Sequence, residues 1–144
     1  MDERDLARTK VCACDSVRSA ARAITQRYDQ ILAPSGLRAT QFSLLARLVN
    51  LGPLTLGELA APLVMDRTTL TRNIALLERE GWVRVETGTD RRTRLVSVTD
   101  EGRAMALRAL PLWDEAQAYV TGAFGLDRLK ALRKELGTFT KTLR

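Results

Sequence analysis

The fold is decided by residues 54–102, which have the sequence LTLGELAAPLVMDRTTLTRNIALLEREGWVRVETGTDRRTRLVSVTDEG. Thr55 is a residue type that favours the N-cap of a helix, and a short apolar helix is expected to follow over residues 56–61. We expect Pro62 to close this helix, because proline has no N–H to continue the hydrogen-bond pattern. With a second helix expected over residues 67–80, the stretch has the pattern of two short helices around a turn.

The second helix has clear ends and two different faces. Asp66 is expected to cap its start, and Gly81 stands where a C′ glycine ends a helix. Apolar residues recur at i, i+4 and i+7 on one buried stripe, formed by Leu70, Ile74 and Leu77. The opposite face carries Thr68, Arg72, Ala75 and Arg79.

Such a helix can enter the major groove of DNA. Arginine can pair with guanine there, and threonine offers a hydroxyl group to a base or phosphate and a methyl group to thymine. The candidate DNA-binding residues of this helix are Arg67, Thr68, Thr69, Thr71 and Arg72. The pattern alone leaves open that this is an ordinary solvated helix face.

A basic β-hairpin is expected directly after the helix. Residues 82–87 and 94–98 alternate with period two, and residues 88–93 join them as a hairpin tip. A two-stranded ribbon is only marginally stable alone, so its apolar face should pack on the helices through Val83, Val85, Val96 and Val98. The arginines left to project outward, where they can meet phosphates or a narrow minor groove, are Arg91, Arg92 and Arg94.

Here the sequence resembles a known family, the MarR-type winged helix-turn-helix regulators. Residues 90–102 resemble the family's wing signature, an Asp-x-Arg tip followed by an apolar return strand and Thr-x-x-Gly. Residues 70–83 are similar to its recognition helix and the exit from it, and residues 36–45 resemble its second helix. By this resemblance Arg92 is the tip arginine, and we expect Asp90 to orient the tip instead of touching DNA. The resemblance covers nearly the whole chain and implies a dimer that binds double-stranded DNA.

Length and charge agree with a DNA-binding protein. A chain of 144 residues with 45% hydrophobic residues is one globular domain by the usual size range. The net charge of +6 favours a polyanionic partner. A membrane surface is the competing polyanion, but no apolar run reaches the roughly 18 residues that a spanning helix needs. The charged N-terminus has no signal-peptide pattern, so a cytoplasmic location is expected.

Long helices are expected on both sides of the winged region. One runs from about Asp5 to Leu32, and its apolar stripe is Cys14, Val17, Ala21, Ile24, Tyr28 and Ile31. The next is expected to be capped by Thr40 and ended by Gly52. A long helix over residues 100–123 contains Pro111, which should bend it. The last helix, from about Asp127, carries Leu129, Leu132, Leu136, Phe139 and Leu143.

These helices carry more apolar surface than a small winged domain can cover. They either complete a monomeric core or interlock in a two-fold dimer, and we favour the dimer because helix-turn-helix dimers use their symmetry to grip two half-sites. The expected fold is mainly α, a winged helix-turn-helix with long N- and C-terminal dimerisation helices and one β-hairpin wing. Within the single chain 1–144, residues 5–34 and 100–144 are the expected dimerisation helices. Residues 38–99 are the expected DNA-binding region.

Nothing in the sequence favours an enzyme. It has no histidine, no Walker-type phosphate loop and no Gly-x-Gly-x-x-Gly, so the usual nucleophile-base pairs and nucleotide sites are missing. Asp114 and Glu115 are adjacent on a helix, point about 100° apart and are expected to be solvated. We therefore expect no catalytic residue, no cofactor and no metal site. A winged-helix module that binds protein instead of DNA remains the alternative function.

The family resemblance implies two alternatives for the signal that controls DNA binding. The family resemblance implies a small aromatic ligand between the dimerisation helices and the winged domain, with candidate contacts at Arg18, Arg22, Tyr28, Phe42 and Trp113. It also implies an alternative, sensing of organic peroxide, because Cys14 precedes Tyr28 by the spacing of the peroxide-sensing branch. That branch has a further tyrosine at the position of Arg18, and aromatic residues near Ala39 that this chain lacks.

Cys12 and Cys14 are the only cysteines of the chain. Two residues apart on one helix they would point about 200° apart, so a disulfide between them would need local unfolding. Three roles stay open: inert packing of a buried thiol, oxidation of Cys14 that loosens operator binding, and coordination of a soft metal across the dimer. The expected protein is a regulator, a repressor more than an activator, released from a pseudo-palindromic operator by a ligand or by thiol oxidation.

Overall fold

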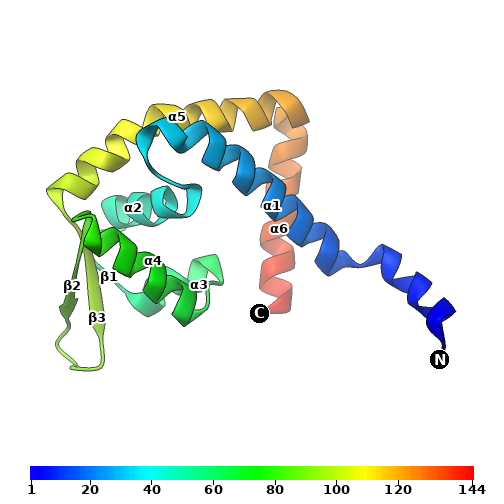
Figure 1. The fold of residues 1–144 in the computed structure, drawn as a ribbon, viewed down its shortest axis with the longest axis horizontal. Coiled ribbons are helices and arrows are strands. Elements are labelled where there is room, and N and C mark those ends of the chain that lie inside the picture. Colours follow the sequence, from blue (N-terminus) through cyan, green and yellow to red (C-terminus); the bar gives the residue numbers. More distant parts are fainter.

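The computed structural model describes residues 1–144, and the chain is mainly helical. Two long helices, α1 and α5, lie side by side above a winged region, while α6 runs back behind α1 and the N-terminal turns project away from the body (Figure 1). The elements in chain order are η1 (Glu3–Val11), α1 (Ala13–Leu32), η2 (Ala33–Ser35), α2 (Ala39–Leu51), β1 (Leu54–Thr55), α3 (Leu56–Leu63), α4 (Arg67–Arg79), β2 (Val83–Thr87), β3 (Arg94–Val98), α5 (Asp100–Phe124) and α6 (Leu126–Leu143).

The predicted hairpin is confirmed as part of a three-stranded antiparallel sheet with the order β1-β3-β2. In the hairpin Val85 pairs with Val96, and the short strand β1 adds Leu54 on the other side of the same residue. The sequence did not predict β1, because a two-residue strand after Pro53 shows no periodicity of its own. Its pairing closes one edge of β3 and ties the wing to the start of α3.

The core lies between α2, the helix-turn-helix and the first half of α5. The predicted stripe of α4 is buried, with Leu70 and Leu77 at 0% exposure and Ile74 at 3%. The predicted wing residues pack on the same core, since Val83 and Val96 are buried and Val85 and Val98 are partly buried against it. The largest fully buried side chains come from almost every element around α2 and are Leu32, Leu37, Leu44, Leu45, Leu48, Leu59, Leu70, Leu77 and Val96.

Three helices start where the sequence predicts and one does not. Thr55, Asp66 and Thr99 cap α3, α4 and α5, each accepting a backbone N–H three residues ahead. Thr40, however, lies inside the first turn of α2. The helix begins at Ala39, two residues earlier than a Thr40 cap would place it, and Asp29 of α1 accepts the Ala39 N–H at 2.8 Å and so caps α2 from another helix.

Two expected boundaries were wrong. Pro62 lies inside α3, which ends at Leu63, because the residue after it, Val64, takes the left-handed conformation that stops the helix. The N-terminal helix expected over residues 5–32 is interrupted at Cys12, whose ψ of 114° is extended. No side chain of η1 is buried, so no tertiary contact stabilises a continuous α-helix through this point.

Large apolar side chains remain exposed along the flanking helices. On α6, Leu132, Leu136 and Phe139 are 41–43% exposed, and Ile24 of α1 is 42% exposed. The expected stripes on α1 and α6 are thus present but uncovered within one chain. None of the helices is both long and apolar enough to cross a membrane.

Candidate nucleic-acid interface

Helix α4 is fixed at its N-terminus by Asp66. The Asp66 carboxylate accepts the Thr69 N–H at 3.0 Å and the Thr69 hydroxyl at 2.6 Å. These hydrogen bonds, the hydroxyl first, hold the pKa of Asp66 below its ordinary value, so the cap is a carboxylate at neutral pH. A negative charge there also complements the positive end of the helix dipole.

The outer face of α4 is open to solvent. Its first three turns border an open hollow of about 410 Å³, lined by Arg67, Thr68, Thr71, Arg72 and Ala75. Four of the five predicted DNA-binding residues of this helix therefore share one surface. Thr69 differs, because its hydroxyl is occupied by the Asp66 cap and so orders the helix start.

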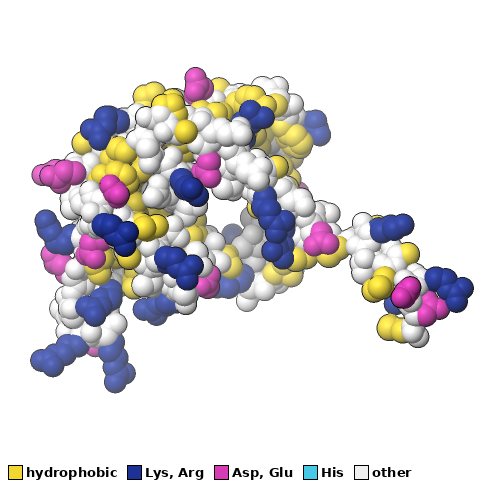
Figure 2. Space-filling view, in the orientation of Figure 1, with side chains coloured by type: hydrophobic (Ala, Val, Ile, Leu, Met, Phe, Trp, Pro, Cys, Tyr) yellow, Lys and Arg dark blue, Asp and Glu magenta, His cyan; other side chains and the backbone are white.

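The tip of the wing is built by Asp90. Its Oδ1 accepts the Arg92 N–H at 3.1 Å, and its carbonyl oxygen accepts the Thr93 N–H at 2.9 Å. These bonds close the turn that carries Arg91 and Arg92, neither of which forms an ion pair within the chain. Figure 2 shows Lys and Arg side chains gathered at the end of the hairpin, away from the body. Arg94 is different, since its Nη1 donates to Thr87 Oγ1 at 3.0 Å and ties the two strands together.

The exit of α4, the wing and α5 meet at one junction. Gly81 has φ +79°, a conformation that glycine adopts without strain. The Thr99 hydroxyl donates to the Gly81 carbonyl at 2.6 Å, and the Thr99 N–H donates to the Trp82 carbonyl at 3.0 Å. The same hydroxyl accepts the Gly102 N–H and so caps α5.

Gly102 explains the last position of the Thr-x-x-Gly motif. A Cβ atom at this residue would overlap the Trp82 carbonyl oxygen and would lie 2.9 Å from the Trp82 carbonyl carbon and 3.0 Å from Val98 Cγ2. Only a residue without a side chain allows the α5 backbone to approach the wing this closely. The motif therefore joins α4 and the wing to the long helix α5 that leads away from them.

Comparison with known proteins agrees with this geometry. Residues 37–93, which span α2, the helix-turn-helix and most of the wing, match the MarR family. MosR, a transcriptional regulator of M. tuberculosis whose crystal structure was solved in complex with DNA, is 43% identical to this chain. The superposition covers 92% of this chain and 98% of MosR, with a TM-score of 0.80. The chain belongs to the MarR family.

Two further MarR-type proteins show how far the likeness extends. The uncharacterised regulator YwoH of Bacillus subtilis is 38% identical to this chain over 85 residues. The match spans 59% of this chain and 62% of YwoH, which is less than two thirds of that relative. A mutant MarR of E. coli, solved with operator DNA, is 23% identical and superposes with a TM-score of 0.79 over 90% of this chain and 94% of its own, which shows a shared fold. MarR proteins are winged-helix transcriptional regulators, and membership places this chain among them instead of among enzymes.

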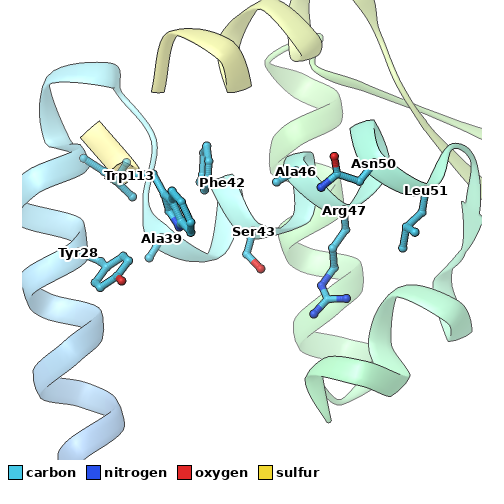
Figure 3. A pocket seen from close by; sticks show the side chains of 10 residues that line it. Tyr28, Ala39, Phe42, Ser43, Ala46, Arg47, Asn50, Leu51 and Trp113 are labelled. Carbon is cyan, nitrogen blue, oxygen red and sulfur yellow. The ribbon is translucent and has the colours of Figure 1, made fainter. Parts of the chain in front are cut away.

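A cavity of about 520 Å³ lies between α1, α2 and α5 (Figure 3). Three of the predicted pocket residues, Tyr28, Phe42 and Trp113, line it together. The rings of Phe42 and Trp113 stack with their centroids 6.1 Å apart. The Tyr28 hydroxyl donates to Gln117 Oε1, and burial raises the pKa of Tyr28, which keeps the phenol neutral.

The two predicted pocket arginines are not in this cavity. Arg22 borders a separate shallow depression on α1, and Arg18 is exposed on the same helix. The cavity has an arginine that the sequence did not predict, Arg47 of α2, whose Nε is buried without a hydrogen-bond partner. A single charged residue inside the apolar run 44–48 was the sequence signal for it.

The two cysteines are free, and their positions relative to α1 differ from the expectation. Cys12 lies at the break before α1 and is half-buried, while Cys14 is in the first turn of α1 and is exposed. They do not share one helix, so the expected 200° separation does not apply. Cys14 and Tyr28 are fourteen residues apart on α1, a rise of about 21 Å, so they cannot touch within one chain.

Proposed function

We propose that this protein is a cytoplasmic transcriptional regulator, acting as a repressor, that binds a pseudo-palindromic DNA operator as a homodimer. The observation that carries the proposal is the joint presentation of two cationic surfaces, the α4 face with Arg67 and Arg72 and the wing tip with Arg91 and Arg92. The α4 face would read bases in the major groove, and the wing would contact phosphates or the minor groove beside it. The DNA seen with MosR, at 43% identity, supports the same assignment.

The dimer would be formed by residues 5–34 and 100–144, leaving 38–99 for DNA. Support comes from the exposed apolar side chains of α1 and α6, which one chain leaves in water. A two-fold axis between the long helices would place two recognition helices about 34 Å apart, the spacing of successive major grooves. A signal that favours another spacing would lower operator affinity by its differential binding to the two states.

For the signal we propose a small aromatic ligand or thiol oxidation. The cavity lined by Tyr28, Phe42 and Trp113 has the size of a small-molecule site, and the Arg47 guanidinium in its wall would favour a ligand with a negative charge. The exposed Cys14 thiol would instead reduce an organic hydroperoxide to the alcohol and become a sulfenic acid. The sulfenic acid could then condense with a partner cysteine or a small thiol, which forms a disulfide and releases water.

Duplex binding as a function of salt concentration tests the proposal. A regulator of this kind binds random duplex in a strongly salt-dependent way, because its arginines release counterions from phosphates. Arg72→Ala and Thr68→Ala should each reduce binding to a selected site by about 1–3 kcal/mol, with a smaller effect on random duplex. A winged-helix module that binds only protein would show no duplex binding at low salt.

The signal is tested on the same complex. Operator affinity is measured with and without an organic hydroperoxide for wild type, Cys12→Ser and Cys14→Ser. Loss of binding that disappears in Cys14→Ser would support thiol sensing, whereas equal and peroxide-insensitive binding by all three proteins would exclude it. A thermal-shift screen of aromatic carboxylates against wild type and Arg47→Ala then tests the cavity.

A further inference from the structure

One edge of the wing is free of strand pairing. In an antiparallel pair alternate residues direct their backbone groups toward the neighbouring strand. The Gly88 N–H donates to Thr93 at 2.8 Å and the Trp82 carbonyl accepts from Thr99 at 3.0 Å, so the even-numbered residues of β2 face β3. The N–H of Val85 therefore points to the outer edge of the sheet, away from β3.

Glu78 reaches this edge from the last turn of α4. Its Oε2 accepts the Val85 N–H at 3.1 Å, the one side-chain hydrogen bond between α4 and the hairpin. The Glu78 carbonyl oxygen also accepts the Gly81 N–H at 3.0 Å, which forms the turn out of the helix. One residue thus holds both the turn after α4 and the strand that follows it.

The geometry points to Glu78 as a positioning residue that sets the wing relative to the recognition helix on DNA. The inference rests on the proposed function, because it concerns how two DNA-contacting surfaces act together. The base of the hairpin is tied to the body by β1 and by the Thr99 hydrogen bonds. The outer edge of β2, which follows the short turn at Gly81, is hydrogen-bonded to α4 through Glu78 alone. The Glu78 side-chain oxygen limits movement of β2 against α4, because it accepts the Val85 N–H, which no neighbouring strand pairs. The wing tip with Arg92 is then held in register with the α4 face.

The direction in which Glu78→Ala changes DNA affinity distinguishes a positioning role of Glu78 from an effect of its charge alone. A carboxylate near DNA repels phosphates, so removing it should strengthen binding if charge alone mattered. A positioning role predicts the opposite for Glu78→Ala. Glu78→Gln removes the charge and keeps an oxygen acceptor. Glu80→Gln removes an equal charge two residues further along, from a side chain that makes no hydrogen bond.

The experiment is a double-substitution cycle on a duplex selected by the wild-type dimer. We expect Glu78→Ala to weaken binding about fivefold to tenfold, with Glu78→Gln close to wild type and Glu80→Gln no weaker than wild type. Arg92→Ala should cost less in the Glu78→Ala protein than in wild type, because a wing that is no longer held contributes less. Amide exchange at Val85, measured without DNA, should be at least severalfold faster in Glu78→Ala than in Glu78→Gln.

The outcomes that would overturn the inference are distinct. Additive effects of Glu78→Ala and Arg92→Ala, or equal exchange at Val85 in all variants, would overturn the positioning role while leaving DNA binding intact. Failure of the wild-type protein to bind any duplex would overturn the proposed function together with the inference. Thermal unfolding of each variant separates a local change from a general loss of fold, because the loss of one hydrogen bond lowers the midpoint by only about 4 °C.

Discussion

Replacing Gly102 by alanine tests the junction that joins the wing to α5. The added methyl group would overlap the carbonyl of Trp82, the residue before β2, and would lie against Val98 at the end of β3. A clash with backbone cannot be relieved by rotating a side chain, so α5 and the exit of α4 must move apart. This movement removes the bonds from Thr99 to the Gly81 and Trp82 carbonyls.

The expected loss of stability is large for one methyl group. Overpacking typically costs about 1–3 kcal/mol, and each of the two lost hydrogen bonds costs about 1 kcal/mol. Alanine in a helix recovers about 1 kcal/mol relative to glycine. The free energy of unfolding should therefore fall by about 2–4 kcal/mol, a decrease in the unfolding midpoint of about 8–16 °C for a chain of this size.

The assay is thermal unfolding followed by circular dichroism at one fixed protein concentration, since a dimer unfolds at a midpoint that depends on concentration. Gly57→Ala is the matched control, because Gly57 lies in α3 and its added Cβ would meet only Thr55 Oγ1 at 3.9 Å. That variant should unfold at or slightly above the wild-type midpoint. A Gly102→Ala protein whose unfolding midpoint lies within about 2 °C of wild type would refute the close approach of α5 to Trp82. A difference of about 2 °C corresponds to about half a kcal/mol, which is taken as the limit of detection.

Three further predictions concern the turn, the cap and the wing. Val64 has φ +51°, so Val64→Gly should stabilise the fold by about 1 kcal/mol in urea unfolding, and an unchanged midpoint would argue against strain there. Hydrogen bonds from Thr69 lower the pKa of Asp66 in the folded protein. The ionised Asp66 therefore stabilises the fold above its unfolded-state pKa of about 4, and this contribution is lost as pH falls through the folded-state pKa. Asp66→Asn should therefore lose less stability than wild type between about pH 6 and pH 3, and equal losses would contradict this. Arg92→Ala should weaken binding to many duplexes and reduce the salt slope by about one, whereas an unchanged slope would mean that the wing stays clear of DNA.

The sequence predicted what depends on local periodicity. The stripe of Leu70, Ile74 and Leu77 repeats at helical spacing, so the order of residues along the chain is enough to assign the buried and open faces of α4. The hairpin followed in the same way from alternation of period two. The caps at Thr55 and Asp66 were predictable because each needs only its own side chain and a backbone N–H three residues on.

What the sequence did not predict depends on contacts between distant segments. The cap of α2 comes from Asp29 on another helix. Arg47 stands out in the sequence as a charge in an apolar run, but its place in a cavity follows only from the packing of α1 and α5 against α2. Glu78 belongs to α4 and Val85 to β2, so neither the helical nor the strand periodicity of the sequence predicts the hydrogen bond between them. The break at Cys12 also has no local signal, since it reflects the missing packing of residues before it.

The proposed dimer reads DNA through α4 and the wing together. Selection of binding sites by the purified protein from a random duplex library tests it most directly. We expect an enriched pseudo-palindrome whose half-site centres are about 10 base pairs, or about 34 Å, apart. Arg72→Ala should lose preference at particular bases, and Arg92→Ala should lose affinity without a change in the selected sequence. Recovery of unenriched random sequence, or of the same sequence with the same preference from Arg72→Ala, would contradict it.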